Sequence, residues 1–290
     1  MINLVGRQIE NYRIDALLCE GGMGAVYRAH DLNLARSVAL KVMHSHFAKQ
    51  PEFQRRFLQE AQAAARLGDH PSIVNIYNYG HQPNLSYMVM EFVPGASLGT
   101  YIKHVQENNQ VVKLSETLHT LAQVADALNY AHRQGVIHRD IKPDNVLLKP
   151  LDEPDRKDGL PVRSVVTDFG LAKLLEGGVE TRPGTFMGTL PYMSPEQCLG
   201  KELDGRSDLY SLGIMLFQLA TGQLPFDIKS PTDAVLKHIN EEPPSPQEVR
   251  PGVPSGVAAV IEKSIAKNPA DRYQTGEEMA DALRRAAAGL

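Results

Sequence analysis

The sequence contains, between residues 136 and 148, the stretch Val136-Ile-His-Arg-Asp-Ile-Lys-Pro-Asp-Asn-Val-Leu-Leu148. Two apolar runs bracket a short polar segment, and this segment holds the acid Asp140, the base Lys142 and the amide Asn145. Functional side chains concentrate on loops that rigid flanking elements hold in place. The stretch is therefore more typical of an active site than of a solvated turn.

A second acidic position follows in Val165-Val-Thr-Asp-Phe-Gly170, where Asp168 ends an apolar run. A carboxylate placed there can offer the hard oxygen ligands that Mg²⁺ prefers. We therefore regard Asp168 as a candidate metal ligand.

A glycine cluster lies near the start of the chain, in Leu18-Cys-Glu-Gly-Gly-Met-Gly-Ala-Val26. Clustered glycines let backbone N–H groups approach phosphate oxygens without a side-chain clash, although a tight hairpin turn would explain them equally well. The following segment, Ala25-Val-Tyr-Arg-Ala29, reads as a strand, which disfavours a dinucleotide-binding unit. The G-x-x-x-x-G-K-[ST] pattern of a P-loop does not occur.

Lys41 ends the run Val38-Ala-Leu-Lys41 on a predicted strand. An interior lysine is costly to bury without a partner, so it needs an anion, either a phosphate or a carboxylate. A lysine that extends its ammonium group from a strand edge into water is the alternative. Glu60, on the next predicted helix, is the candidate carboxylate partner, although a helical glutamate is often only a solvated charge.

The rest of the chain divides into a strand-rich part and a helical part. We expect a first lobe near residues 10–92 with one main helix, a connector at 91–95 and a helical lobe near 96–288. Two polar stretches, 105–112 and 149–162, read as surface insertions in exposed loops. The expected strands cover 12–18, 25–29, 37–43, 73–79 and 87–92, and the expected helices cover 52–67, 118–133, 209–221, 234–240, 257–266 and 276–288.

The bulk composition is that of a soluble globular protein of 290 residues with 42% hydrophobic residues. A net charge of −4 argues against a nucleic-acid partner. Cys19 and Cys198 lack metal-ligand spacing, which fits a reducing compartment. We find neither a signal peptide nor a membrane-spanning apolar run, and expect a cytoplasmic protein or the cytosolic part of a longer, membrane-anchored parent.

The order of the four motifs, from glycine loop through lysine and HRD-x-x-x-x-N to DFG, matches the signature of protein kinases. The chain resembles the eukaryotic-like (Hanks-type) serine/threonine protein kinases over about residues 10–285. Gly21-Gly-Met-Gly-Ala-Val-Tyr27 and Tyr192-Met-Ser-Pro-Glu-Gln197 resemble the bacterial subgroup. The resemblance implies an α+β, bilobal protein-kinase fold over residues 10–288, with a small antiparallel sheet in the N-lobe and a larger, mostly α-helical C-lobe.

The resemblance also implies a reaction, the transfer of the γ-phosphoryl of ATP to serine or threonine hydroxyls of proteins. Asp140 would accept or orient the proton of the attacking hydroxyl, and Lys142 would neutralise the γ-phosphate. Asn145 and Asp168 would hold two Mg²⁺ ions. The implied cofactors are therefore ATP and Mg²⁺.

For the nucleotide, the resemblance implies that Lys41 grips the α- and β-phosphates while it is paired to Glu60. The adenine would lie between two walls and hydrogen-bond to the connector backbone, at the carbonyl of residue 91 and the N–H of residue 93, with Met90 as gatekeeper. The implied ATP-binding set is Leu18, Gly21, Gly22, Gly24, Val26, Ala39, Lys41, Glu91, Val93 and Leu147.

Four further residues have structural roles by the same resemblance. Thr189 would contact Asp140 and Lys142. This contact is typical of serine/threonine rather than tyrosine specificity. Glu196 would pair with Arg272, and Asp208 would brace the backbone of the catalytic loop.

Regulation is a hypothesis at this stage. Arg139 precedes the catalytic aspartate, and Lys173 and Arg56 match family positions that join it in a pocket for an anion. A phosphate on Thr185 could supply that charge, so we predict autophosphorylation of Thr185 within an activation segment near residues 171–193. The alternative is that Thr185 is merely a polar loop residue. By analogy with bacterial relatives, a homodimer through the N-lobe is possible.

Cys19 departs from the family pattern, because it replaces the first glycine of the glycine loop. We expect an altered nucleotide affinity without loss of activity, and a thiol that a reactive compound could modify. Two other functions are considered, a pseudokinase and a kinase of small molecules. The complete catalytic set argues against the first, and the Ser-Pro-Glu segment with Thr189 and Arg272 argues against the second.

Overall fold

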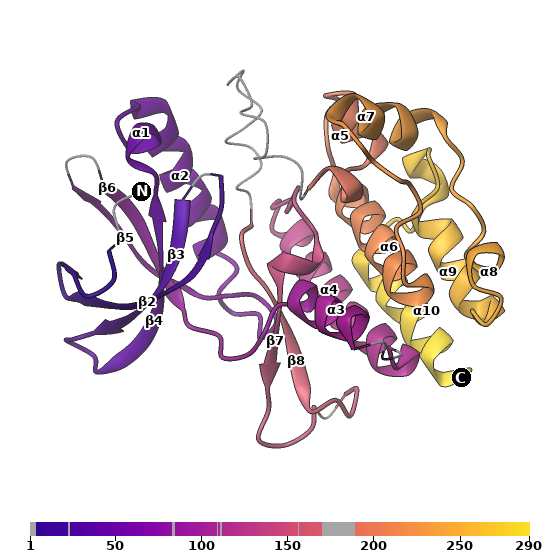
Figure 1. The fold of residues 1–290 in the computed structure, drawn as a ribbon, viewed down its shortest axis with the longest axis horizontal. Helices are drawn as coiled ribbons and strands as arrows, with labels where there is room; N and C mark the ends of the chain where they lie inside the picture. The colour runs from indigo at the N-terminus through magenta and orange to yellow at the C-terminus, as the bar shows by residue number, and fades with distance from the viewer. Residues whose placement is uncertain are drawn as a thin grey trace.

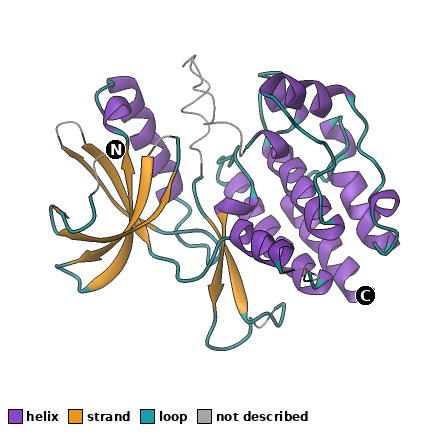
Figure 2. Ribbon diagram, viewed as in Figure 1, coloured by secondary structure: helices purple, strands orange, loops and turns teal. Residues whose placement is uncertain are grey.

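The computed structural model describes residues 4–22, 24–82, 85–108, 110, 112–155, 157–169 and 189–290. A sheet with two helices lies on one side of the molecule, and a group of helices lies on the other (Figure 1). A small hairpin of two strands stands between them (Figure 2). The α+β, bilobal arrangement expected from the sequence is thus confirmed.

The N-lobe is built on one antiparallel sheet of six strands in the order β1-β2-β3-β4-β6-β5. One face of the sheet buries the alternate apolar side chains of its strands, as period-two patterning predicts. The strands are β1 (Gln8–Ile9), β2 (Tyr12–Glu20), β3 (Gly24–Asp31), β4 (Arg36–Met43), β5 (Ile76–Gln82) and β6 (Leu85–Glu91). The short helix α1 (Ser45–Ala48) and the longer α2 (Pro51–Ala65) follow β4.

Helix α2 begins with Pro51 in its first turn, where the missing N–H of proline has no intrahelical partner to lose. Its buried face repeats at three- and four-residue spacing and includes Phe53, Phe57 and Ala61. This face packs against Met43 and Met88 of the sheet. Because Glu60 lies on the same face, the helix carries a carboxyl group into the apolar layer beside the sheet.

The C-lobe is organised around α6, which is buried almost all round, as its apolar sequence predicts. Helices α4 and α9 pack directly against it, and α10 packs against α4. Gly213 permits the close approach of α9, since a Cβ there would stand 2.5 Å from the Cβ of Ser264. The helices are α3 (Leu98–Glu107), α4 (Leu114–Arg133), α5 (Pro195–Cys198), α6 (Gly205–Thr221), α7 (Pro231–Asn240), α8 (Pro246–Val249), α9 (Ser255–Ser264) and α10 (Gly276–Ala288).

The hairpin between the lobes consists of β7 (Val146–Pro150) and β8 (Val162–Val166), paired antiparallel. The catalytic loop runs directly into β7, and Asp168 follows directly after β8. Val74 donates a backbone hydrogen bond to Val166 at 3.0 Å, which ties the hairpin to the chain just ahead of β5. The pairing of β7 with β8 therefore brings two motifs that are distant in sequence to one end of the same hairpin.

Two expectations about exposed loops were correct only in part, because residues 106–108 and 152–154 are exposed but other parts of both stretches are not. The stretch 105–112 begins inside α3, where Val105 is buried. The stretch 149–162 contains strand residues at both ends, and Asp158 within it has a buried side chain that accepts hydrogen bonds from Arg284 and Gln123. The insertion is polar in sequence because its charges meet partners on α4 and α10. The expected strand at 73–79 also begins only at Ile76.

Candidate active site

The catalytic loop connects the end of α4 with β7, and its last residues form a single 3₁₀ turn over Pro143–Asn145. This turn buries Asn145 and directs its amide back toward Asp140. Nδ2 of Asn145 donates hydrogen bonds to the Asp140 carbonyl at 2.7 Å and to its Oδ2 at 3.1 Å. The loop is thus folded upon its own acidic residue.

The Asp140 carboxylate also receives two donors from other residues. Nζ of Lys142 lies 2.8 Å from Oδ2, and the hydroxyl of Thr189 donates to Oδ1 at 2.9 Å. Lys142 contacts the same hydroxyl at 2.9 Å. Three residues that the sequence placed together by resemblance therefore share one polar cluster, in which an acid, a cation and a hydroxyl are mutually bonded.

Asp208, in the first turn of α6, holds the backbone of the catalytic loop. Its carboxylate accepts from the N–H of His138 and of Arg139, each at 2.8 Å, and from Nε2 of His132 at 2.7 Å. Burial acts to raise the pKa of Asp208, but these donors outweigh it and the pKa lies below its ordinary value. The aspartate therefore stays ionised while it fixes two consecutive peptide groups of the loop.

His138 is a site residue that the sequence analysis did not single out. Its ring is fully buried, and Nε2 donates to the carbonyl of Thr167 at 2.8 Å while Nδ1 accepts from the N–H of Asp140 at 3.2 Å. The ring also packs on Phe169, with centroids 4.6 Å apart. The only sequence signal was a histidine directly after an apolar pair. His138 joins the catalytic loop to the segment that carries Asp168.

Asp168 adopts a left-handed backbone conformation with φ of 65°, which is uncommon for a residue other than glycine. Its Oδ1 lies 2.6 Å from Nζ of Lys41 on β4. Burial acts to raise the pKa of Asp168, yet the charge and hydrogen bond of Lys41 lower it overall. Lys41 and Asp168 thus form an ion pair that joins the two lobes.

The expected ion pair between Lys41 and Glu60 is not present, which corrects the sequence-based expectation. Glu60 is 6% exposed, and within the described residues neither of its carboxyl oxygens has a hydrogen-bond partner. Burial raises the pKa of Glu60 to about 9, even though the charge of Lys41 acts in the opposite direction. Because Lys41 is engaged by Asp168, Glu60 is held as a neutral acid.

The residues expected to enclose the adenine gather in one apolar cluster at the lobe junction. Ala39, Met90 and Val93 are buried there, and Val26 and Leu147 pack against them. In the connector, the Glu91 carboxylate accepts hydrogen bonds from Lys149 at 2.7 Å and from Asn75 at 3.0 Å. Leu18, at the outer end of the glycine loop, is 47% exposed.

The glycine loop is the turn between β2 and β3, closed by a hydrogen bond from Gly21 N–H to the Gly24 carbonyl at 2.8 Å. Gly24 has a structural reason to be glycine, because a Cβ there would lie 2.2 Å from the carbonyl oxygen of Val42. Gly21 has no such neighbour, and Gly22 is exposed beside it. The hairpin interpretation therefore accounts for Gly24 but not for Gly21, for which the phosphate-loop interpretation stays a prediction.

The thiol of Cys19 is exposed at the end of β2. Desolvation, followed by the charge of Asp168, raises its pKa above the ordinary value. The thiol is accordingly protonated at neutral pH and is a weak nucleophile.

Two oxygen atoms at this site have the chemistry that Mg²⁺ requires. Asn145 uses its Nδ2 on Asp140, which leaves its amide oxygen to bind a cation, and Asp168 has a second carboxylate oxygen beyond the one that Lys41 contacts. Among the described residues, no group of three or more His, Cys, Asp or Glu side chains could hold a metal. Mg²⁺ commonly needs only one or two protein oxygens together with substrate phosphates, so the set fits this ion.

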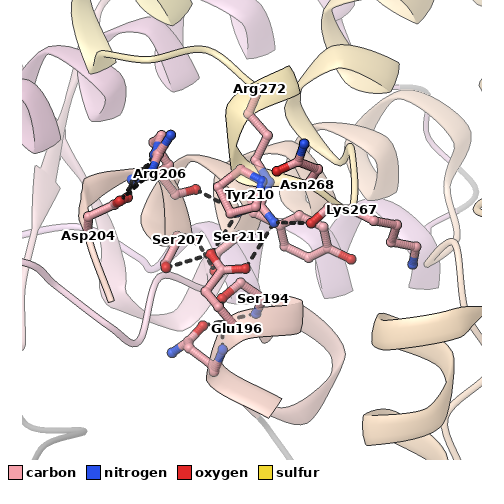
Figure 3. A network of polar contacts seen from close by, with 12 residues as sticks. Ser194, Glu196, Asp204, Arg206, Ser207, Tyr210, Ser211, Lys267, Asn268 and Arg272 are labelled. Atoms are coloured by element: carbon pink, nitrogen blue, oxygen red, sulfur yellow. Dashed lines mark hydrogen bonds and ion pairs between the residues drawn. The ribbon is translucent and has the colours of Figure 1, made fainter. Parts of the chain in front are cut away.

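The segment after Thr189 is anchored in the C-lobe core by a buried ion pair (Figure 3). Arg272 is 1% exposed and binds Glu196 through both terminal guanidinium nitrogens, at 2.7 and 2.9 Å. Ser207 donates a third hydrogen bond to the same carboxylate at 2.6 Å, and Arg272 also donates to the carbonyls of Ala266 and Lys267. The network fixes α5 between α6 and the segment ahead of α10.

Thr185 and Lys173, two of the three residues expected to take part in regulation with Arg139, lie outside the described residues. The third, Arg56, hydrogen-bonds to Glu52 one helical turn earlier on α2. In the part of the chain that the structure describes, no helix combines the length and the apolar character needed to cross a bilayer.

A two-lobed fold, with an apolar cluster at the lobe junction beside a loop that holds Asp140, Lys142 and Asn145, is the arrangement of the protein kinase class. The protein kinase domain family matches residues 12–283, so the chain belongs to that family. The comparisons with relatives place it among the Hanks-type serine/threonine kinases found in bacteria.

The chain is 40% identical to the serine/threonine-protein kinase PrkC of Bacillus subtilis over 95% of its own length and 40% of that protein. It is 37% identical to the serine/threonine-protein kinase PknA of Mycobacterium tuberculosis, over 99% of the chain and 63% of the relative. The crystal structure of the Mycobacterium tuberculosis PknI kinase domain matches with a TM-score of 0.75 at 28% identity, over 98% of this chain and all of that one. The chain therefore spans less than two thirds of each of these two curated relatives.

Proposed function

We propose that this chain transfers the γ-phosphoryl group of Mg-ATP to serine and threonine hydroxyls of proteins. The observation that carries the proposal is the Asp140 carboxylate, bonded to both Lys142 and the Thr189 hydroxyl. The hydroxyl group of Thr189 already lies within hydrogen-bonding distance of the Asp140 carboxylate and of the Lys142 ammonium group. A substrate hydroxyl placed beside them would contact the Asp140 carboxylate, which would act as the base, and the positive charge of Lys142.

In the proposed reaction, Asp140 orients the attacking hydroxyl and takes its proton, and Lys142 offsets the negative charge of the phosphoryl group in transit. Asn145 and Asp168 would hold Mg²⁺, which neutralises phosphate charge when it is bound. Asp208 and His138 keep the loop backbone in place, so that little reorganisation is needed when the reaction occurs.

Lys41 has a further proposed role, which requires a change from the arrangement described above. Mg²⁺ held by Asp168 would compete with the Lys41 ammonium group for the negative charge of that carboxylate. Lys41 would then contact the α- and β-phosphates and the carboxyl of Glu60, whose proton would leave as the pair forms.

We also propose, as parts of the same function, autophosphorylation at Thr185 and a homodimer through the N-lobe. Exposed apolar side chains of the N-lobe, Leu32, Leu34 and Tyr77, are consistent with a contact surface there. We also propose a cytoplasmic location, either for this chain alone or as the cytosolic part of a longer, membrane-anchored parent, since the chain spans only part of its curated relatives. The free thiols of Cys19 and Cys198 fit a reducing compartment.

The function is tested by incubating the chain with labelled ATP, Mg²⁺ and a basic protein substrate, for the wild type and for Asp140→Asn. Loss of the base should lower the rate by about a hundredfold or more. Transfer that survives unchanged in Asp140→Asn would contradict the assigned base, and a wild type that binds Mg-ADP without transfer would indicate a pseudokinase. Aminoglycosides and sugars in place of protein test the small-molecule alternative.

The same incubation followed by peptide mapping locates any phosphate that the chain adds to itself. We expect phosphate on Thr185 and a reduced rate for Thr185→Ala. Full activity of Thr185→Ala would contradict the proposed role of this threonine.

A further inference from the structure

One residue of α5 contacts the catalytic loop without belonging to any of the roles described above. Gln197 uses both ends of its side-chain amide. Its Oε1 accepts a hydrogen bond from the backbone N–H of Ser194 at 2.9 Å, and its Nε2 donates one to the backbone carbonyl of Arg139 at 2.7 Å. These partners define the orientation of the amide, because the N–H can only donate and the carbonyl can only accept.

The carbonyl that Gln197 holds belongs to the peptide group that leads into Asp140. The other end of this peptide, the N–H of Asp140, donates to Nδ1 of His138 at 3.2 Å. The preceding N–H, that of Arg139, donates to Asp208 at 2.8 Å. Gln197 therefore completes a set of three contacts that fix successive backbone groups around the catalytic aspartate.

The backbone at this point needs support, because Arg139 has a φ of 69°. A non-glycine residue in the left-handed region costs free energy and persists only where its surroundings hold it. Rotation about the N–Cα bond of Arg139 would relieve this conformation, and it would also move the Arg139–Asp140 peptide and swing the Asp140 carboxylate. A hydrogen bond to the peptide carbonyl opposes that rotation directly.

Helix α5 is a rigid base for such a contact. Ser194 is fully buried, its Oγ accepts from the N–H of Gln197, and the two side chains form a capping box. The adjacent Glu196 is clamped to Arg272 in the core. The segment between Thr189 and α5 thus meets the catalytic loop at both of its ends, through the Thr189 hydroxyl and through Gln197.

We propose that Gln197 is a positioning residue for phosphoryl transfer, which holds the Arg139–Asp140 peptide so that the Asp140 carboxylate faces the substrate hydroxyl. The inference rests on the kinase activity proposed above. Gln197 acts through the backbone of Arg139 and has no contact of its own with the Asp140 side chain among the hydrogen bonds described. Its loss should lower the rate of the chemical step and leave nucleotide binding unchanged.

The chain allows the two contacts of Gln197 to be separated. Gln197→Glu keeps an oxygen for the Ser194 N–H, and glutamate serves as well as glutamine in a capping box. The same variant has no N–H donor and sets a carboxylate oxygen against the Arg139 carbonyl. Gln197→Met, of similar length, removes both contacts.

Gln247 provides a matched control at a remote position. It stands in the first turn of the short helix α8, and its Nε2 donates to the backbone carbonyl of Val253 at 3.0 Å. Gln247→Glu therefore makes the same chemical change at the start of a helix and breaks the same kind of hydrogen bond, away from the catalytic loop.

The experiment compares the full chain and these variants in steady-state and single-turnover transfer to a basic protein substrate. Mg-ADP affinity and stoichiometry are measured by calorimetry, together with the unfolding temperature. For Gln197→Glu we expect kcat and the single-turnover rate to fall about tenfold, with an unchanged KM for ATP and a full Mg-ADP stoichiometry. Its unfolding temperature should stay within about 2 °C of the wild type. Gln197→Met should lose rate and also unfold at a lower temperature, and Gln247→Glu should keep the wild-type rate.

Three results would overturn the proposal. The first is a kcat of Gln197→Glu within about twofold of the wild type. The second is a loss of rate that equals a loss of molecules able to bind Mg-ADP, because that would indicate misfolding only. The third is an equal loss of rate in Gln247→Glu. A wild-type chain without transfer activity would instead contradict the proposed function, and the same assay distinguishes that outcome.

Discussion

Two buried glutamates, one in each lobe, have opposite surroundings. Glu196 in the C-lobe is 8% exposed and receives two hydrogen bonds from Arg272 and one from Ser207. Glu60 in the N-lobe is 6% exposed, and its carboxyl oxygens have no hydrogen-bond partner in the described ranges. Burial acts to raise the pKa of both. At Glu196 the hydrogen bonds from Arg272 outweigh burial and lower the pKa, whereas at Glu60 burial prevails and raises the pKa.

The comparison separates a permanent support from a contact that can change. Glu196 and Arg272 hold the segment that follows Thr189, and a pair of buried charges whose hydrogen bonds are all made has no reason to change partners. Glu60 carries an unsatisfied acid that gains a partner if Lys41 leaves Asp168. We infer that the Glu196–Arg272 pair of the C-lobe keeps a fixed arrangement, whereas Lys41 and Glu60 of the N-lobe can change partners.

The largest effect is expected from breaking the permanent pair. Arg272→Ala should lower the free energy of unfolding by about 3–5 kcal/mol, because it leaves the Glu196 carboxylate buried without its counter-charge. Urea unfolding of the variant measures this. The double variant Arg272→Met with Glu196→Gln should recover part of the loss, since the buried charge is then gone. A cost below about 1 kcal/mol for Arg272→Ala would show that the pair is not a major support.

A smaller effect is expected at Glu60, and it depends on pH. The folded pKa of about 9 lies above the ordinary value of 4.5, so between these values the folded chain binds a proton that the unfolded chain has lost. The stability from this group is therefore complete below pH 4.5 and is lost as the pH rises toward 9. In the nucleotide-free chain, Glu60→Gln should abolish about 4 kcal/mol of the decline in unfolding free energy between pH 5 and pH 8.

The control for this measurement is Glu153→Gln, which removes the same charge from an exposed position. It should leave the pH profile of the wild type unchanged. Parallel profiles for the wild type and Glu60→Gln would show that Glu60 is ionised in the folded chain, and the contrast between the lobes would then disappear.

The smallest effect concerns a buried side chain that is neutral and fully bonded, His238 on α7. Nε2 donates to the carbonyl of Leu190 at 3.1 Å, and Nδ1 accepts from the hydroxyl of Tyr210 at 2.9 Å. Burial, followed by the charge of Lys267, lowers the pKa of His238 to about 4 from an ordinary 6.5. The unfolded chain therefore binds more protons between these values, and stability falls as the pH is lowered through this window.

We expect His238 to account for about 1–2 kcal/mol of the loss of unfolding free energy between pH 7 and pH 5. His238→Gln, which keeps a donor for the Leu190 carbonyl, should flatten the profile in this range. An equally steep loss in the variant would assign the effect to other groups.

Much of the active site could be predicted because its residues are close in sequence or follow a fixed order. Asp140, Lys142 and Asn145 occur within one short loop, and local folding alone brings them together. Asp168 follows β8, and an antiparallel hairpin returns it to the same place. Long apolar helices such as α6 were also predictable, since their pattern depends on burial and not on a particular partner.

The partners of charged and polar side chains were less predictable. The sequence suggested that Lys41 binds Glu60 and that Asp158 lies in an exposed loop. It suggested no role for Gln197. Each outcome depends on which of several nearby groups comes within about 3 Å, a distance that sequence spacing does not specify.

The amino-acid sequence is thus sufficient to assign the family, the two-lobed architecture and the residues at the centre of the proposed reaction, because recurring motifs encode local geometry. Only the three-dimensional arrangement shows that Lys41 binds Asp168, that Glu60 is buried without a hydrogen-bond partner among the described residues and that Gln197 hydrogen-bonds to the catalytic loop. These features depend on burial and on competition among neighbouring charges, and both arise only when distant segments pack together.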